Sequence, residues 1–304
     1  MSLVVTRLFG AEIRIFSDTK VTSPEELLKG VNNSVLKAVT LRPDLCICFA
    51  GRIGPAQVAL ENLDRIIGKA VFDLEEVLEY LRQVHLETEH VTDFIIATLS
   101  PKPALYRIRN GKVERDLDMC WIGDQDAFST YQRFFSEMPI LDRDDVSPQM
   151  AEILNIILRM HMAFIKLVES GKHASVGEFM IEIGTNPGEG FYHEGIHIGH
   201  PGALALLQPI DDPEKIREWA AASGSYSFSI LAPDKAGIGA IGIHFYEGNF
   251  GALFYPVKSK TPILVRDVDV DEFKKAVSDK FGVCLEGLPT NVSGQVKDGD
   301  TRAL

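Results

Sequence analysis

The sequence predicts an α+β fold in which helices are layered on antiparallel sheet. Strands and helices come in blocks of each kind, whereas strict alternation of the two would indicate a parallel sheet. Consecutive strands are separated by short turn-forming pairs, which is typical of antiparallel hairpins. Two hairpins come first: residues 3–9 and 12–17 turn at Gly10-Ala11, and residues 36–41 and 44–51 turn around Pro43.

Hydrophobic periodicity places the remaining elements. Apolar residues recur at helical spacing over residues 55–69 and 73–90, which predicts two helices. Further strands are expected at 92–100, 104–116 with a turn at Asn110-Gly111, 119–124, 178–184, 190–198, 225–233, 238–248 and 250–257, and further helices at 125–138, 148–170, 211–223 and 269–282. We expect one domain over residues 1–200, a C-terminal β/α extension packed on it over residues 201–288, and a flexible polar tail over residues 289–304.

Composition disfavours several classes of protein. The chain has 304 residues, is 45% hydrophobic and carries a net charge of −12, which allows a sizeable core and argues against nucleic acid and anionic membranes as partners. No secretory signal is recognisable, and no stretch approaches the roughly 18 consecutive apolar residues of a membrane span. Cys46, Cys48, Cys120 and Cys284 lack the spacing of a metal knuckle. A cytoplasmic protein with reduced thiols and neither metal nor cofactor is the simplest interpretation.

One stretch matches a zinc-protease signature. His193-Glu194-Gly195-Ile196-His197 has the H-E-x-x-H pattern, which brings two imidazoles to one metal when it lies on a helix. Several nearby glycines disfavour a helix, and the alternation of residue types predicts a strand with His193 and His197 on one side. Because four residues of strand span about 13 Å, the match is expected to be accidental, and a zinc hydrolase is the weakest alternative function.

A second motif matches the dinucleotide-binding pattern G-x-G-x-x-G over Gly237–Gly242. Nucleotide binding needs a helix directly after the glycines, so that the helix N-terminus meets the phosphates. The residues that follow are β-branched, aromatic and interrupted by glycine, which predicts a strand and a hairpin. The glycines are therefore expected to mark a place where another backbone packs closely.

A more specific pattern lies in the first 57 residues. Residues 16–24 read "FSDTKVTSP" and residues 36–57 read "LKAVTLRPDLCICFAGRIGPAQ", and the later strands and helix over 92–135 follow in order. This set resembles the proteasome β-subunit family and its bacterial peptidase relatives, which are N-terminal-nucleophile hydrolases. The resemblance covers roughly residues 2–198, about two-thirds of the chain. It implies a four-layer αββα sandwich, hydrolysis of a peptide or another small amide, and a homo-oligomer.

The resemblance also implies roles for single residues. In the family, the hydroxyl of the first residue attacks a carbonyl while the free α-amino group takes its proton. Ser2 would be this nucleophile once Met1 is removed. Lys37 would lower the pKa of the amine, and Asp18 would hold Lys37. Gly51 would supply an N–H to the oxyanion, and Ser175 would support the first residue.

The chain departs from the family at two points. Ser2 replaces the usual threonine, and Met1-Ser2-Leu3 is also the kind of sequence that recombinant expression leaves behind. Lys172 stands three residues before Ser175, where the family carries an aspartate. Non-catalytic α-type proteasome subunits keep a similar lysine and a similar glycine turn. A non-catalytic subunit or binding module therefore remains the main alternative to a hydrolase.

Overall fold

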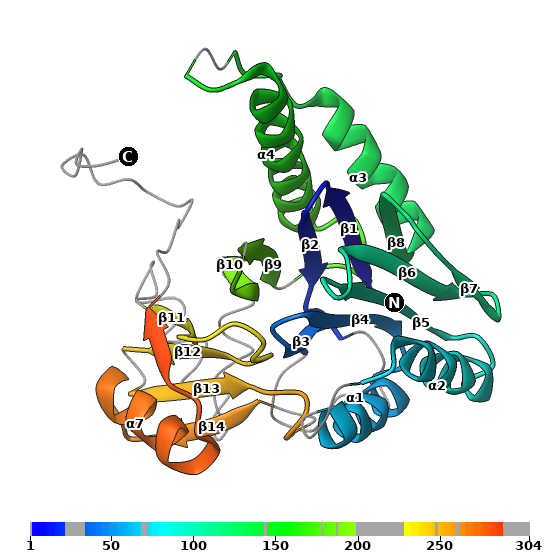
Figure 1. The fold of residues 1–304 in the computed structure, drawn as a ribbon. Coiled ribbons are helices and arrows are strands. Elements are labelled where there is room, and N and C mark those ends of the chain that lie inside the picture. The colour runs from blue at the N-terminus through cyan, green and yellow to red at the C-terminus, as the bar shows by residue number, and fades with distance from the viewer. Residues whose placement is uncertain are drawn as a thin grey trace.

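The computed structural model describes residues 2–21, 34–67, 72–142, 145–177, 179–186, 188–198, 228–246, 249–259 and 262–287. Over these residues the fold is mixed α+β, with five helices and three antiparallel sheets of five strands each (Figure 1). The predicted fold class is therefore confirmed at this level. No helix within these ranges is long and apolar enough to cross a membrane. The helix expected at 211–223 and the tail expected at 289–304 lie outside the described residues.

The first sheet contains the beginning of the chain. Its strand order is β10-β9-β2-β1-β8. The strands are β1 (Leu3–Phe9), β2 (Glu12–Asp18), β8 (Met119–Gly123), β9 (Phe179–Asn186) and β10 (Gly190–Ile198). The β1–β2 hairpin turns at Gly10, whose φ of 63° suits a residue without a Cβ. In this order the N-terminal strand β1 is the fourth of five, between β2 and β8.

The second sheet has the order β3-β4-β5-β6-β7. Its strands are β3 (Ala38–Arg42), β4 (Leu45–Gly51), β5 (Thr92–Thr98), β6 (Ala104–Arg109) and β7 (Lys112–Glu114). The expected turns are present, at Pro43-Asp44 between β3 and β4 and at Asn110-Gly111 between β6 and β7. Asn110 and Gly111 both have positive φ, which is the backbone that an Asn-Gly hairpin turn requires.

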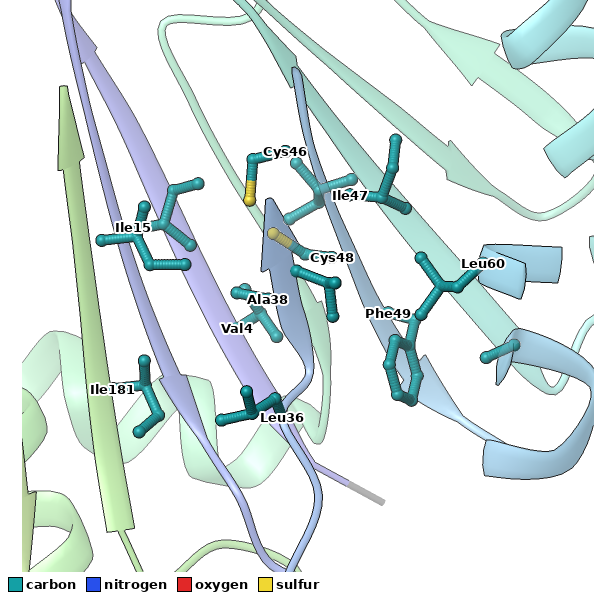
Figure 2. Packing of buried hydrophobic residues seen from close by; sticks show 14 of the residues in the cluster. Val4, Ile15, Leu36, Ala38, Cys46, Ile47, Cys48, Phe49, Leu60 and Ile181 are labelled. Atoms are coloured by element: carbon teal, nitrogen blue, oxygen red, sulfur yellow. The ribbon is translucent and has the colours of Figure 1, made fainter. Parts of the chain in front are cut away.

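Helices lie on both sheets, and the sheets share a core. Helices α1 (Ile53–Ile67) and α2 (Leu74–Glu87) contact the second sheet, whereas α4 (Pro148–Glu169) contacts the first and packs on α3 (Gln125–Glu137) (Figure 1). One apolar cluster joins Val4 and Ile15 of the first sheet to Cys46 and Cys48 of the second. Figure 2 shows both thiols on the side of β4 that faces Val4 and Ile15. Both cysteines therefore lie in the core between the two sheets.

The third sheet, of order β14-β13-β12-β11-β15, forms the C-terminal region. Its elements are β11 (Phe228–Pro233), β12 (Ile241–Phe245), β13 (Phe250–Phe254), β14 (Ile263–Arg266), helix α7 (Val270–Phe281) and β15 (Leu285–Gly287). Phe273 of α7 lies in a core of its own with Leu253, whereas Ile243 and Phe254 belong to the core shared by the other two sheets. The C-terminal region is thus a β/α unit in contact with the rest of the chain, and its strands β14 and β15 were not predicted.

The Gly237–Gly242 stretch leads into strand β12, as its composition predicted. Gly237 has a φ of 82°, and a Cβ there would overlap the backbone of Arg42 and Pro43 in the β3–β4 turn. Its N–H donates to the Phe191 carbonyl over 2.9 Å, and the Phe191 N–H donates to the Pro43 carbonyl over 2.8 Å. The glycine therefore allows three chain segments to meet. Because the glycines lead into a strand, they do not place a helix N-terminus where it could bind a phosphate.

We expect Gly237→Ala to destabilise the protein by at least about 2 kcal/mol, because it adds a steric overlap to the strain of a left-handed backbone. Gly10→Ala is the matched control. Gly10 also has positive φ, but a Cβ there would meet no atom within 4 Å. The control should lose only the roughly 1–2 kcal/mol of backbone strain. Urea unfolding of both variants checks the difference, and equal losses would mean that the close approach does not matter.

Candidate active site

A buried ion pair lies where β2 ends and β3 begins. The Lys37 ammonium is 2.8 Å from Asp18 Oδ2, and the two side chains are 1% and 0% exposed. Lys37 Nζ also donates to the Lys20 carbonyl over 2.5 Å. Burial raises the pKa of the Asp18 carboxyl, and the Lys37 ammonium and the backbone N–H groups of Leu3 and Lys20 oppose this rise. The pairing that the resemblance implies is thus present.

The peptide group between Ser2 and Leu3 is held at both ends. The Leu3 N–H donates to Asp18 Oδ1 over 2.8 Å, and the Asp124 N–H donates to the Ser2 carbonyl over 2.7 Å. Gly123 lies so close to the Ser2 carbonyl that a Cβ would overlap it, and its φ of 109° is one that glycine tolerates. Ser2 itself is buried. One carboxylate, Asp18, therefore links the start of β1 directly to Lys37.

Ser175 is connected to Ser2 through Asp124, whereas Lys37 is connected to the same peptide group through Asp18. The Ser175 hydroxyl donates to Asp124 Oδ2 over 2.5 Å, and Asp124 is the residue whose N–H holds the Ser2 carbonyl. The strand that follows Ser175 begins beside the end of β2, because the N–H of Phe179, the first residue of β9, donates to Thr19 Oγ1 over 3.1 Å. Lys172, by contrast, is exposed. The structure thus brings Ser2, Asp18, Lys37 and Ser175 into one connected set.

Asp124 was not among the residues singled out from the sequence. It is the N-cap of α3, and its Oδ1 accepts from the N–H groups of Asp126 and Ala127 over 2.9 and 3.1 Å. Burial raises the pKa of Asp124, but hydrogen bonds from Ser175 and these N–H groups outweigh it and leave the pKa lowered. An aspartate between a strand and a helical periodicity is an N-cap signal that the sequence does contain. Its contact with Ser175, 51 residues away, leaves no local signal.

Gly51 lies at the end of β4, opposite Thr92 in β5. Its φ is 120°, and a Cβ there would overlap the Val91 carbonyl, which explains why a glycine stands at this position. The Phe49 N–H, two residues earlier on β4, donates to the Lys37 carbonyl over 2.9 Å. Gly51 therefore lies two residues beyond the β4 residue that bonds to Lys37, but among the described contacts it is not joined to the connected set around Ser2.

The stretch that matched the zinc signature is strand β10, with a β-bulge between His193 and Gly195. His193 pairs with Ile183, which belongs to the core shared by the sheets, whereas His197 pairs with Met180 and contacts Glu169 of α4 over 3.1 Å. The expectation that His193 and His197 share one side was wrong, because the extra residue of the bulge reverses the alternation. Histidines on opposite faces of a sheet cannot bind one metal ion. Within the described ranges, no group of three or more His, Cys, Asp or Glu side chains could hold one.

Burial of His193 predicts an acid-dependent loss of stability. Desolvation lowers its pKa from 6.5 to about 4, and its Nε2 has no hydrogen-bond partner in the described structure. The unfolded chain therefore binds a proton below about pH 6.5, whereas the folded one does so only near pH 4. Stability from neutral His193 is full above pH 6.5, and about 3 kcal/mol of it should be lost as the pH falls to 4. Between pH 7 and pH 4 the free energy of unfolding of wild type should fall by this amount relative to that of His193→Leu, and an unchanged difference would contradict the assignment.

Comparison with known proteins gives no match, either to a family model or to a curated protein sequence. The site consists of a buried lysine–carboxylate pair, a Ser2–Leu3 peptide group held by hydrogen bonds and a serine hydroxyl bonded to a second carboxylate.

Proposed function

We propose that the chain is an N-terminal-nucleophile hydrolase in which Ser2, with its amine freed by removal of Met1, cleaves a peptide or another small amide. The observation that carries the proposal is the double contact of Asp18. One of its carboxylate oxygens accepts from the Leu3 N–H and the other from Lys37 Nζ. This single side chain places an ammonium group beside the start of the chain, in a buried site where charges act strongly.

The proposed reaction has two steps. The Ser2 hydroxyl attacks the substrate carbonyl while the α-amino group takes its proton, and collapse of the tetrahedral intermediate releases the amine product with that proton. An acyl ester remains on Ser2 until water hydrolyses it. Lys37 lowers the pKa of the α-amino group so that it is neutral and can act as a base, and Asp18 keeps Lys37 in place. Gly51 is the proposed N–H donor to the oxyanion.

The arrangement of elements supports the same proposal. The two sheets that share a core carry helices on their outer faces, and we propose that they form the four-layer αββα sandwich of this superfamily (Figure 1). The segment after α4 returns to the end of β2 through the Phe179–Thr19 hydrogen bond. This return supports the proposed role of Ser175, whose hydroxyl contacts Asp124, the residue whose N–H bonds to the Ser2 carbonyl. A cytoplasmic location belongs to the proposal, and the four free cysteines support it.

The test is hydrolysis of a panel of peptides and acyl amides by the full chain produced with Ser2 as its first residue. Ser2→Ala should abolish cleavage, because the nucleophile is lost. Asp126→Asn is a suitable control, since this exposed side chain lies close by on α3. Cleavage that survives Ser2→Ala would place the active site elsewhere.

A non-catalytic subunit or binding module is the second candidate, and the burial of the pair favours it. Lys37 is enclosed and bonded to Asp18 and to the Lys20 carbonyl, and Ser2 is only 3% exposed. In such a protein the pair would be purely structural. The same panel separates the two functions: a properly folded, Ser2-first protein that cleaves no member of it would support the non-catalytic role.

We further propose a homo-oligomer that uses helix α4. The helix carries more apolar side chains than its face against the rest of the chain can bury. Met160 and Leu167 are buried, whereas Met150, Leu158 and Met162 are 39–44% exposed. Leu158→Glu should shift the protein toward monomer in sedimentation at micromolar concentration. Val58→Glu is the control, because Val58 is an apolar residue on α1 whose exposure, 46%, is close to the 39% of Leu158. A wild-type monomer would contradict this part of the proposal.

A further inference from the structure

The carboxylate that the family places three residues before Ser175 is absent, because Lys172 stands there and is exposed. A site that depends on the orientation of its first residue needs another group in place of this carboxylate. Asp124 is the carboxylate that contacts Ser175, and it reaches that serine from α3 and not from the loop of residues 172–175.

Asp124 is held more firmly than an ordinary surface aspartate. Its Oδ1 accepts from the two N–H groups of the first turn of α3, which fixes the side chain and leaves Oδ2 directed at the Ser175 hydroxyl. The backbone N–H of Asp124 donates a hydrogen bond to the Ser2 carbonyl. Backbone and side chain of one residue therefore contact both the first peptide group and the serine expected to support it.

The surroundings keep this carboxylate ionised. Its hydrogen bonds leave its pKa lowered despite partial burial, and His173 adds a further favourable charge interaction when protonated. His173 itself bonds to Thr130 of α3 over 2.9 Å, which fastens the loop to the same helix. A negative charge is thus maintained on Asp124, the residue whose backbone N–H bonds to the Ser2 carbonyl.

We propose that Asp124 is the positioning residue of this site. From its place at the start of α3 it performs the role of the aspartate that the resembled family carries where this chain has Lys172. With Ser175 it orients the first residue on the side opposite Asp18 and Lys37. The inference rests on the proposed hydrolase for its consequences in catalysis, but the placement of a carboxylate beside the N-terminal amine can be tested without any activity.

Asp124→Asn is the informative variant. Asparagine caps a helix as well as aspartate does and keeps the backbone N–H, so the fold should persist while the charge is lost. We expect kcat/KM to fall about 10²-fold, the loss typical of a misplaced reacting group. Ser175→Ala should lower it similarly, and the double variant should lose little more, because the two side chains act as one unit. Asp126→Asn is the control and should retain wild-type kinetics.

The readout that is independent of activity is an NMR titration of the α-amino group in the Ser2-first protein. Loss of a nearby carboxylate should lower the pKa of this amine in Asp124→Asn but not in Asp126→Asn. Equal titrations in the two variants would overturn the inference whether or not the protein is an enzyme. A lowered pKa in a protein that cleaves nothing would uphold the positioning role and refute the hydrolase.

Discussion

Lys37→Met should lower the free energy of unfolding by about 3–5 kcal/mol, because it leaves the Asp18 carboxylate buried without its cation. Adding Asp18→Asn should restore part of this loss, since the uncompensated charge disappears with it. The measurement is urea unfolding of the single and double variants at pH 7. A loss under about 1 kcal/mol for Lys37→Met would mean that Asp18 is neutral or reached by water.

Lys258→Met is the matched control for this effect. Lys258 also pairs with an aspartate, Asp64, over 3.2 Å, but the two side chains are 46% and 30% exposed. Its removal should change stability by no more than about 1 kcal/mol. In the proposed hydrolase, Lys37→Met should also reduce the rate at least about 10²-fold, because the α-amino base loses the charge that lowers its pKa.

Acetylation of the N-terminal amine should abolish activity as completely as Ser2→Ala, because the base in the proposed reaction is the amine itself. Ser2→Thr should retain cleavage, since threonine supplies a hydroxyl at the same atom. The measurement is turnover of one amide substrate by the free, acetylated and substituted proteins.

Acetylation of lysine side chains must be excluded by mass in this comparison, because Lys37 is part of the same site. Full activity in a protein acetylated only at its first residue would contradict an amine base, even if Ser2→Ala were inactive.

Much of the fold could be predicted because it follows local rules. The two N-terminal hairpins turn where Gly10 and Pro43 stand, and the helices follow apolar spacing. Strands β14 and β15 were missed because four and three residues are too few to show a periodicity. In β10, His193 and His197 were wrongly expected on the same side of the strand. The bulge between them adds a residue that hydrophobic alternation does not reveal.

Some residues of the candidate site could likewise be predicted from the sequence, and others could not. Asp18 and Lys37 could be singled out only through the resemblance of the sequence to a known family, and the structure brings the two together. Asp124 could not, because its importance arises only when the start of α3, the start of β1 and the loop before β9 meet. Lys172 was conspicuous in the sequence because the family that the chain resembles carries an aspartate there, and the carboxylate that we propose as its substitute comes from another element.

The proposed hydrolase works only if Ser2 becomes the first residue of the mature protein. The mass of the N-terminal peptide of the full-length protein from an untagged, native source tests this. The proposed hydrolase predicts a peptide that begins at Ser2 with an unmodified amine. A peptide that retains Met1, or that carries an acetyl group on Ser2, would contradict it, because no free amine would then stand beside the hydroxyl.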